Sequence, residues 1–436
     1  MPQKSDLVLP LTLICPKGSN NIRKSISNLK LHKGLVAAIA DALRDIFVKN
    51  RQADRVVEQL LKSNKKWGAR DRAFIAENTY EIVRWWRLVK YCAEMKSASE
   101  TEEFWRLVGV WQIIKPQHLQ KVHFETLPDW AEFAEIDPIS IETRYAEALQ
   151  TRKIAQSVPD WLDEVCEQEL GKKWDLEIAA LNVPAPVVLR VNTLKTSLEE
   201  VKTILGADLV SEVAGVPDAL VLNKRQSMQQ SEAFKSGLFE IQDAGSQLIA
   251  PYLDISSGMS VIDACAGAGG KSLHIASLLQ NSGSVLAMDI EPFKLEELKK
   301  RAQRNGVTNL ETMLIESEDI IHSLSQTADR LLLDVPCSGL GVLRRNPDSK
   351  WKLKPEFLEN IRQVQWTILS TYSDMVKTGG KMVYATCSIL PSESEEQVKR
   401  FTKSRKKQWK LVAEHRTSVA KDGFDGFYMA LLERVG

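Results

Sequence analysis

Residues 260–271 read SVIDACAGAGGK, and this stretch decides the fold that the sequence predicts. A short apolar run ends in a glycine-rich turn, after which residues 271–280 have the apolar spacing of a helix. The same alternation continues along the chain. It predicts a strand at 284–289, a helix at 291–305 that stops at Gly306, and strands at 330–335, 381–386 and 427–432. Residues 246–436 are therefore expected to form an α/β domain, a doubly wound, Rossmann-like fold with a parallel sheet.

The chain ahead of this domain divides into three parts. Residues 31–155 have helical periodicity and predict an all-helical N-terminal domain, whose helices fit simple packing and nucleic-acid binding equally well. Residues 156–245 predict a small α+β module that links the two larger domains. Its signals are strands at 187–192, 219–222 and 238–242, and a capping box of Ser197 and Glu200 that opens a helix. Residues 1–30 are expected to be a flexible extension, without the cleavage site of a signal peptide.

Composition narrows the class of protein. A chain of 436 residues exceeds what one hydrophobic core usually serves, so two or three domains are expected. The formal net charge of +1 excludes a protein that coats nucleic acid through bulk charge. The six cysteines lie far apart, which argues against a metal site and a disulfide framework and fits free thiols in a reducing cytoplasm. No segment has the ~20 apolar residues of a membrane span. A cytoplasmic protein, by default a monomer, is the expectation.

The glycine-rich turn is a candidate nucleotide-binding loop. Glycines let a backbone approach a ligand closely, and ligands in open α/β sheets bind at the carboxyl ends of the strands. Asp289 closes the second predicted strand, where a carboxylate can accept both hydroxyl groups of an adenosine ribose. The loop has neither the G-x-G-x-x-G spacing of dehydrogenases nor the glycine pattern of a P-loop.

Two cysteines follow predicted strands at that same edge. Residues 330–339 read RLLLDVPCSG and carry Cys337, whereas residues 381–388 read KMVYATCS and carry Cys387. A single cysteine is most often a buried structural residue. Two cysteines with polar neighbours at a ligand-binding edge instead favour covalent catalysis by a thiolate. The residues by themselves do not select which of the two thiols attacks.

These motifs resemble one known family, the Sun-type, RsmB-like RNA 5-methylcytosine methyltransferases. The resemblance covers most of the chain, in the order 189–192 (LRVN), 241–243 (IQD), Ser246, the glycine loop, Asp289, 334–337 (DVPC), 346–351 (NPDSKW), 385–388 (ATCS) and 425–428 (DGFY). The helical part is similar to the NusB-like RNA-binding domain of the RsmB branch, around 70–74 (RDRAF) and 83–85 (VRW). The resemblance implies a class I methyltransferase domain that uses S-adenosylmethionine.

The resemblance also implies a role for each thiol. Cys387 is expected to add to carbon 6 of a cytosine, which makes carbon 5 nucleophilic enough to accept a methyl group. Cys337 is expected to help release the product. Asp334 lies close to the expected site, where it is expected to hydrogen-bond the base, and Lys271 is expected to line the same pocket.

The resemblance implies a set of residues around the cofactor. They are Cys265, Ala266, Gly267, Ala268, Gly269, Gly270, Lys271, Asp289, Glu316 and Asp334. Ala268 replaces a proline that is common in the family, a change that the flanking glycines are expected to tolerate. The usual aspartate after the third strand is not evident, and Glu316 or Ser317 is expected to take its place.

Local basic patches are the expected RNA contacts. The segment after Cys337 carries five cations near an aromatic ring that can stack on an unpaired base. The candidate RNA-binding residues are Arg190, Arg344, Arg345, Lys350 and Trp351, with Lys352 and Lys354 beside them. A second basic run at 399–410 is expected to be the solvated face of a helix.

Four other functions fit part of the sequence. A methyltransferase with the same motifs can act on transfer RNA, on DNA cytosine or on a small molecule instead of ribosomal RNA. A chain with a vestigial site can serve as a non-catalytic, RNA-binding ribosome-assembly factor. The resemblance favours small-subunit ribosomal RNA as the substrate, and the intact loop and both cysteines favour an enzyme.

Overall fold

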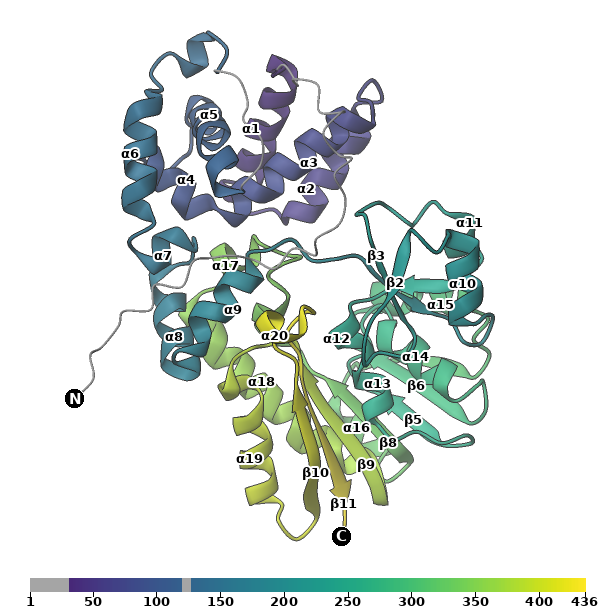
Figure 1. Cartoon of the computed structure of the whole chain (residues 1–436). Helices are drawn as coiled ribbons and strands as arrows, with labels where there is room; N and C mark the ends of the chain where they lie inside the picture. The colour runs from purple at the N-terminus through teal and green to yellow at the C-terminus, as the bar shows by residue number, and fades with distance from the viewer. Residues whose placement is uncertain (1–30, 120–126) are drawn as a thin grey trace, which may run out of the picture.

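The computed structural model describes residues 31–119 and 127–436, and the expected N-terminal extension lies outside them. The first described part is helical, as the apolar periodicity predicts, and forms the upper lobe in Figure 1. Its elements are α1 (Lys33–Phe47), α2 (Ala53–Ser63), α3 (Ala69–Arg84), α4 (Trp86–Cys92), α5 (Thr101–His118), η1 (Ala131–Phe133), α6 (Pro138–Ala148) and α7 (Arg152–Ala155). Their apolar faces share one core around Ile39, Leu88 and Trp111.

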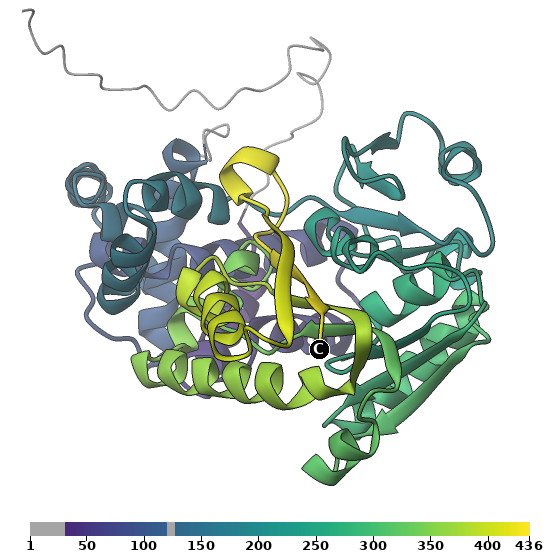
Figure 2. The ribbon, with the colours of Figure 1, turned by 90° about the horizontal axis from the view of Figure 1, so that it is seen from below.

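A small antiparallel sheet follows two further helices. The helices are α8 (Asp160–Leu170) and α9 (Lys173–Leu181), and the strand order is β2-β3-β1-β4. The remaining elements are β1 (Val188–Val191), α10 (Leu198–Leu205), β2 (Val210–Glu212), β3 (Ala219–Leu222), α11 (Glu232–Lys235) and β4 (Phe239–Ile241). Ser197 and Glu200 form the predicted capping box at the start of α10. In Figure 2 the helical lobe and this teal sheet lie on either side of the yellow C-terminal segment.

The C-terminal part contains a seven-stranded sheet in the order β10-β11-β9-β8-β5-β6-β7. Five neighbouring strands, from β9 to β7, are parallel, as the alternating pattern predicts. At one edge of this mainly parallel sheet, β11 and β10 are antiparallel to their neighbours. The strands are β5 (Ser260–Asp263), β6 (Ser284–Asp289), β7 (Leu310–Leu314), β8 (Ala328–Asp334), β9 (Val376–Thr386), β10 (Trp409–Arg416) and β11 (Tyr428–Arg434).

Helices cover both faces of this sheet. Side chains alternate across a strand, so Leu331 and Leu333 of β8 enter one core and Leu332 enters the other. The first core includes α16 (Glu318–Ser323), α18 (Pro355–Tyr372) and α19 (Glu395–Ser404). The second includes α13 (Ile249–Tyr252) and α14 (Gly270–Leu278), with α15 (Pro292–Asn305) beside them. Because β5, β6, β8 and β9 are parallel, their carboxyl ends lie at one edge of the sheet between these two layers of helices.

Short elements complete the domain. They are α12 (Ala244–Gln247), η2 (Leu340–Val342), α17 (Ser349–Lys352), η3 (Ser373–Met375), η4 (Pro391–Glu393) and α20 (Val419–Asp422). Gly306 has φ +72° and ends α15 in the left-handed conformation that glycine favours. In the described part of the chain, none of the helices has both the length and the apolar character needed to cross a membrane.

Candidate active site

The glycine loop connects β5 to α14 at the carboxyl edge of the sheet. Gly269 has φ +86°, and a Cβ atom built on it would lie 2.4 Å from Cγ of Leu298. Only glycine fits there, because both the backbone angle and the contact with α15 exclude a side chain. Asp289 stabilises the loop from the end of β6, where its carboxylate accepts hydrogen bonds from the backbone N–H of Gly267 at 2.8 Å and Glu291 at 2.9 Å.

The loop has room for a ligand. A Cβ atom built on Gly267 or on Gly270 would meet no other atom within 4 Å. Open space above two glycines at the carboxyl ends of β5 and β6 is what a nucleoside needs to approach the backbone closely. Asp289 lies at the end of the neighbouring strand, where an acidic residue can accept the ribose hydroxyl groups. These residues fit the adenosine part of S-adenosylmethionine.

Lys271 and Asp334 form an ion pair beside the loop. Nζ of Lys271 lies 2.5 Å from Oδ2 of Asp334, which joins the start of α14 to the end of β8. Burial opposes the charge of Lys271, but the Asp334 carboxylate outweighs that effect and raises the pKa of the ammonium group. Lys271 therefore keeps its charge and orients Asp334 at the edge of the pocket.

The two predicted cysteines meet at this edge. The Sγ atoms of Cys337 and Cys387 lie 3.2 Å apart, although 50 residues separate them in the sequence. Their strands, β8 and β9, are parallel neighbours, so both loops leave the sheet at the same end. Contact with Cys387 and burial together raise the pKa of the Cys337 thiol well above its ordinary value. A protonated Cys337 can donate a hydrogen bond to the sulfur of Cys387.

A buried acid lies below the loop. Asp263 ends β5, is 1% exposed and accepts a hydrogen bond from Oγ of Ser272 at 2.6 Å. Burial raises its pKa to about 7, against the opposing effect of the Ser272 hydrogen bond. Asp263 is not among the functional residues that the sequence motifs predict. Its position between the apolar strand and the glycine turn is the signal that marks it.

The structure contradicts the predicted RNA contacts of two cations in the segment after Cys337, because both are buried. Arg344 is 8% exposed and donates hydrogen bonds to the carbonyl oxygens of Val183 at 3.1 Å and Gly423 at 2.7 Å. Lys350 is 1% exposed, and its Nζ lies 3.1 Å from Oδ1 of Asn182. These cations do not face solvent, because carbonyl and amide oxygens from distant segments surround them.

Trp351 and its neighbours join the helical lobe to the catalytic domain instead. Nε1 of Trp351 donates to the carbonyl oxygen of Val83 at 2.7 Å, and Nζ of Lys352 donates to that of Arg51 at 2.6 Å. The carboxylate of Asp348 accepts from the backbone N–H of Ala53 at 3.1 Å. The segment is therefore a joint between domains, and the indole of Trp351 is not an open stacking platform.

The two remaining RNA-binding candidates also have structural partners. Arg190 is 3% exposed and donates to the carbonyl oxygen of Gly270 at 2.5 Å, so it links β1 of the small sheet to the glycine loop. Arg345 forms ion pairs with Asp243 and Asp425. The burial of Arg190 contradicts its predicted contact with RNA, whereas the Arg345 side chain is 31% exposed and its RNA-binding role stays a prediction.

Two further sequence predictions concern β7 and the basic run. Glu316 follows β7 in an exposed loop, and its role at the cofactor stays a prediction. The run at 399–410 includes the exposed end of α19, as expected for a solvated helix, but it also begins β10. Trp409 is 3% exposed in the core beside Phe401. The described residues include no group of three or more His, Cys, Asp or Glu side chains arranged to hold a metal ion.

Comparisons with known proteins agree with this geometry. A family model described as 16S rRNA methyltransferase RsmB/F matches residues 250–432, and an RsmF/B-like ferredoxin-like domain matches residues 158–229. The probable ribosomal RNA small subunit methyltransferase B of a Synechocystis species is 32% identical over 391 residues, which cover 82% of this chain and 86% of that protein. The chain belongs to the RsmB/F methyltransferase family. S-adenosylmethionine is therefore the cofactor of this family member.

Other relatives support the same assignment. Ribosomal RNA small subunit methyltransferase B of Vibrio cholerae is 32% identical over 284 residues, or 63% of this RsmB/F-family chain and 65% of that protein. Two solved structures share the fold. The protein PH0851 has a TM-score of 0.77 at 23% identity and covers 93% of this chain and 100% of its own. NSun6 from Pyrococcus horikoshii has a TM-score of 0.58 at 21% identity, covering 64% of this chain and 98% of its own.

The comparisons bear on the fold class as well. The expected Rossmann-like methyltransferase domain behind a helical N-terminal region is confirmed. The likeness of the helical lobe to NusB stays a prediction, because the matched family models begin at residue 158.

Proposed function

We propose that this chain methylates carbon 5 of a cytosine in RNA, with Cys387 as the nucleophile and small-subunit ribosomal RNA as the favoured substrate. The contact of 3.2 Å between the sulfurs of Cys337 and Cys387 carries the proposal. Two thiols at the ligand edge suit a reaction that needs a nucleophile and a second group to release the product. The names of the relatives, which specify ribosomal RNA of the small subunit, support the choice of substrate.

The covalent step solves a specific chemical problem. Carbon 5 of cytosine is too weak a nucleophile to take a methyl group unaided. When the Cys387 thiolate forms a bond to carbon 6, the electron pair of the 5,6 double bond becomes available at carbon 5. S-adenosylmethionine supplies the electrophilic methyl group. The base must be turned out of its stack, since the thiolate approaches carbon 6 from a face of the ring.

Product release reverses the addition. After methylation, a water molecule takes the proton from carbon 5, the electron pair of that C–H bond re-forms the 5,6 double bond, and the bond between carbon 6 and Sγ breaks with its electron pair on Cys387. Cys337 assists this step because its protonated thiol lies within 3.2 Å and can donate a hydrogen bond to the departing thiolate. The raised pKa of Cys337 favours that protonated form.

Asp334 and Lys271 orient the base. Asp334 closes β8 three residues before Cys337, and Lys271 holds its Oδ2 atom at 2.5 Å. A carboxylate in that position can accept a hydrogen bond from the amino group of cytosine, which holds the ring in place for addition at carbon 6. Normal turnover by the Asp334→Ala variant would contradict this role.

The decisive experiment uses the purified chain, S-adenosylmethionine and unmodified ribosomal and transfer RNA. Nucleosides are analysed by mass spectrometry beside a Cys387→Ser control. New 5-methylcytidine in ribosomal RNA, absent with the control, is the expected result. Methylation of transfer RNA alone would identify transfer RNA, and not ribosomal RNA, as the substrate. Cofactor binding without any methylated nucleoside would favour a role in ribosome assembly.

A further inference from the structure

Glu393 is a fully buried carboxylate next to the two cysteines. It is 0% exposed and ends the short helix η4. Its Oε2 accepts hydrogen bonds from the backbone N–H of Ser338 at 2.8 Å and Nε2 of Gln365 at 3.0 Å. Its Oε1 accepts from the hydroxyl groups of Ser338 at 2.5 Å and Ser388 at 2.6 Å. Donors on both oxygens replace the water that a buried carboxyl group gives up.

The partners of Glu393 connect the two catalytic loops. Ser338 directly follows Cys337 after β8, and Ser388 directly follows Cys387 after β9. The serine hydroxyl groups also lie 3.2 Å from one another. Parallel β8 and β9 bring the two loops to one edge, but the ladder ends at Asp334 and Ala385, before either cysteine. Beyond that point, one carboxylate binds both loops.

We propose that Glu393 is a positioning residue that holds the Cys337 and Cys387 thiols against one another through Ser338 and Ser388. The inference rests on the proposed covalent reaction, for which it identifies what aligns the two sulfurs. Glu393 itself contacts neither the substrate nor the cofactor in this assignment. Its effect passes through the backbone of the two serines, each one residue from a reacting thiol.

The charge of Glu393 acts in the same direction as its hydrogen bonds. After contact with Cys387 and burial, the negative charge of Glu393 contributes to raising the pKa of Cys337. A protonated Cys337 is the hydrogen-bond donor of the pair, which suits the proposed role of Cys387 as the nucleophile. The hydrogen bonds of Glu393 and its charge therefore support the same assignment, with Cys337 as the protonated thiol and Cys387 as the nucleophile.

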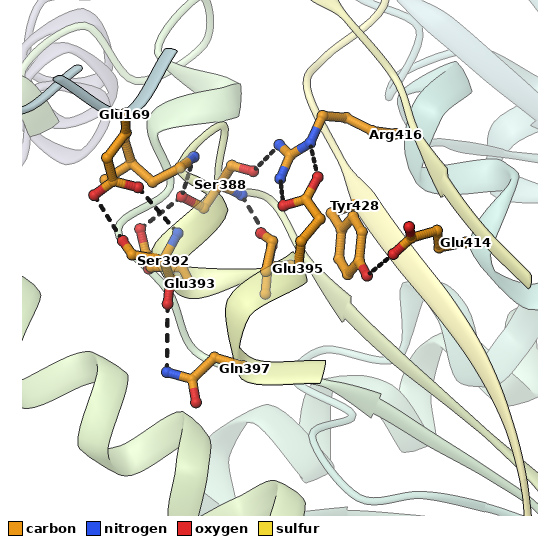
Figure 3. Close-up of polar contacts among 12 residues, drawn as sticks. Glu169, Ser388, Ser392, Glu393, Glu395, Gln397, Glu414, Arg416 and Tyr428 are labelled. Carbon is orange, nitrogen blue, oxygen red and sulfur yellow. Dashed lines mark hydrogen bonds and ion pairs between the residues drawn. The ribbon is translucent and has the colours of Figure 1, made fainter. Parts of the chain in front are cut away.

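Neighbouring contacts hold the segment after Cys387 in place. Figure 3 shows Glu169 of α8 accepting hydrogen bonds from Ser392, through the backbone N–H at 2.9 Å and Oγ at 2.8 Å. Arg416 donates to the carbonyl oxygen of Ser388 at 2.9 Å and pairs with Glu395. Glu169 binds the same turn as Glu393 but reaches neither Ser338 nor Ser388 in the described contacts. It therefore offers a matched control.

The test measures the two thiols separately. The full-length protein is treated with iodoacetamide over a range of pH, and the alkylation of Cys337 and Cys387 is followed by peptide mass spectrometry. In the wild type, Cys387 is expected to react with a lower pH midpoint than Cys337. Glu393→Gln removes the negative charge. It also replaces one accepting oxygen by an amide N–H group, which cannot accept the hydrogen bond that Ser338 or Gln365 donates to that oxygen. The ratio of Cys387 to Cys337 alkylation at neutral pH is then expected to fall about tenfold, which is one unit in the separation of the midpoints.

Controls separate positioning from general loosening. Partial unfolding would accelerate alkylation of both thiols together, whereas loss of positioning brings their pH midpoints closer. Glu169→Gln, which loosens the same turn, is expected to keep the wild-type separation. For methyl transfer by Glu393→Gln, the fold decrease in kcat is expected to exceed the fold increase in KM, because the contacts with the substrate remain.

The alkylation measurements do not depend on RNA. Unchanged midpoints in a folded Glu393→Gln protein would overturn the proposal even if the enzyme methylates cytosine. If that variant does not fold, Ser338→Ala and Ser388→Ala decide, since each removes a hydroxyl link and keeps the carboxylate. Wild-type separation in both serine variants would overturn the proposal. Failure of RNA methylation with the expected alkylation pattern would contradict the proposed reaction alone.

Discussion

Nη1 of Arg344 lies 2.7 Å from the carbonyl oxygen of Gly423, which places a guanidinium group inside the protein between distant segments. Nε donates to Val183, and the backbone carbonyl of Arg344 accepts from Arg84 of the helical lobe. These contacts give the buried guanidinium group hydrogen-bond partners in place of water. Arg344 therefore connects three parts of the chain.

Arg344→Ala is expected to lower the free energy of unfolding by about 2–4 kcal/mol, because it removes the hydrogen bonds of a buried charged group to Val183 and Gly423. Urea titration followed by circular dichroism measures this loss. The exposed Lys354, ten residues further along the chain, provides the control Lys354→Ala, which is expected to change stability by less than about 0.5 kcal/mol. Among variants that remain folded, Arg344→Ala is expected to leave the salt dependence of RNA binding unchanged. A flatter salt dependence would restore the RNA-binding assignment.

Cys337→Ala is expected to trap the enzyme on its RNA. Without the hydrogen bond from Cys337, release of the Cys387 thiolate slows, by about a hundredfold if the contribution resembles that of other acid–base groups. A protein–RNA band that survives denaturing gel electrophoresis measures the trapped species. The double variant Cys337→Ala/Cys387→Ala is expected to show no such band. A stable band in the double variant would contradict Cys387 as the attacking residue.

Two adjacent glycines are expected to respond differently to the same added methyl group. Gly270→Ala is expected to fold normally and to bind S-adenosylmethionine at least about tenfold more weakly, because its Cβ occupies open space at the loop. Gly269→Ala is expected to lose about 1–3 kcal/mol of stability, since its Cβ meets Leu298. Calorimetric titration and thermal unfolding separate the two effects. Wild-type affinity in Gly270→Ala would place the cofactor elsewhere.

Asp263 is expected to make stability depend on pH. Burial raises its pKa to about 7 in the folded protein, whereas an unfolded aspartate titrates near 3.9. Between these values the folded state binds more protons than the unfolded state, so the free energy of unfolding falls as pH rises. The loss is at most about 4 kcal/mol above neutral pH.

Asp263→Asn removes this titration while its amide oxygen still accepts from Ser272. Without added S-adenosylmethionine, urea titrations at pH 5 and pH 8 are expected to show a smaller loss of stability in the variant than in the wild type. The same pH dependence in both proteins would show that Asp263 is ionised throughout.

Local signals predicted most of the secondary structure. The expected strands at 284–289 and 219–222 coincide with β6 and β3, and Gly306 ends α15 as predicted. These elements have apolar periodicity or a terminal residue whose effect spans only a few positions. β10 was missed because most of its residues are exposed at an edge of the sheet, so the strand lacks apolar alternation.

The sequence by itself determined the order of strands and helices, the glycine loop and the placement of two cysteines after successive strands of the catalytic edge. Chain-local properties set those features: dihedral preference, apolar period and the direction of parallel strands. Only the tertiary structure decided that Cys337 and Cys387 touch, that Glu393 binds both loops and that Lys350 is buried. The environment of a charged side chain depends on oxygen atoms supplied from distant parts of the chain, and no local pattern records where those atoms lie.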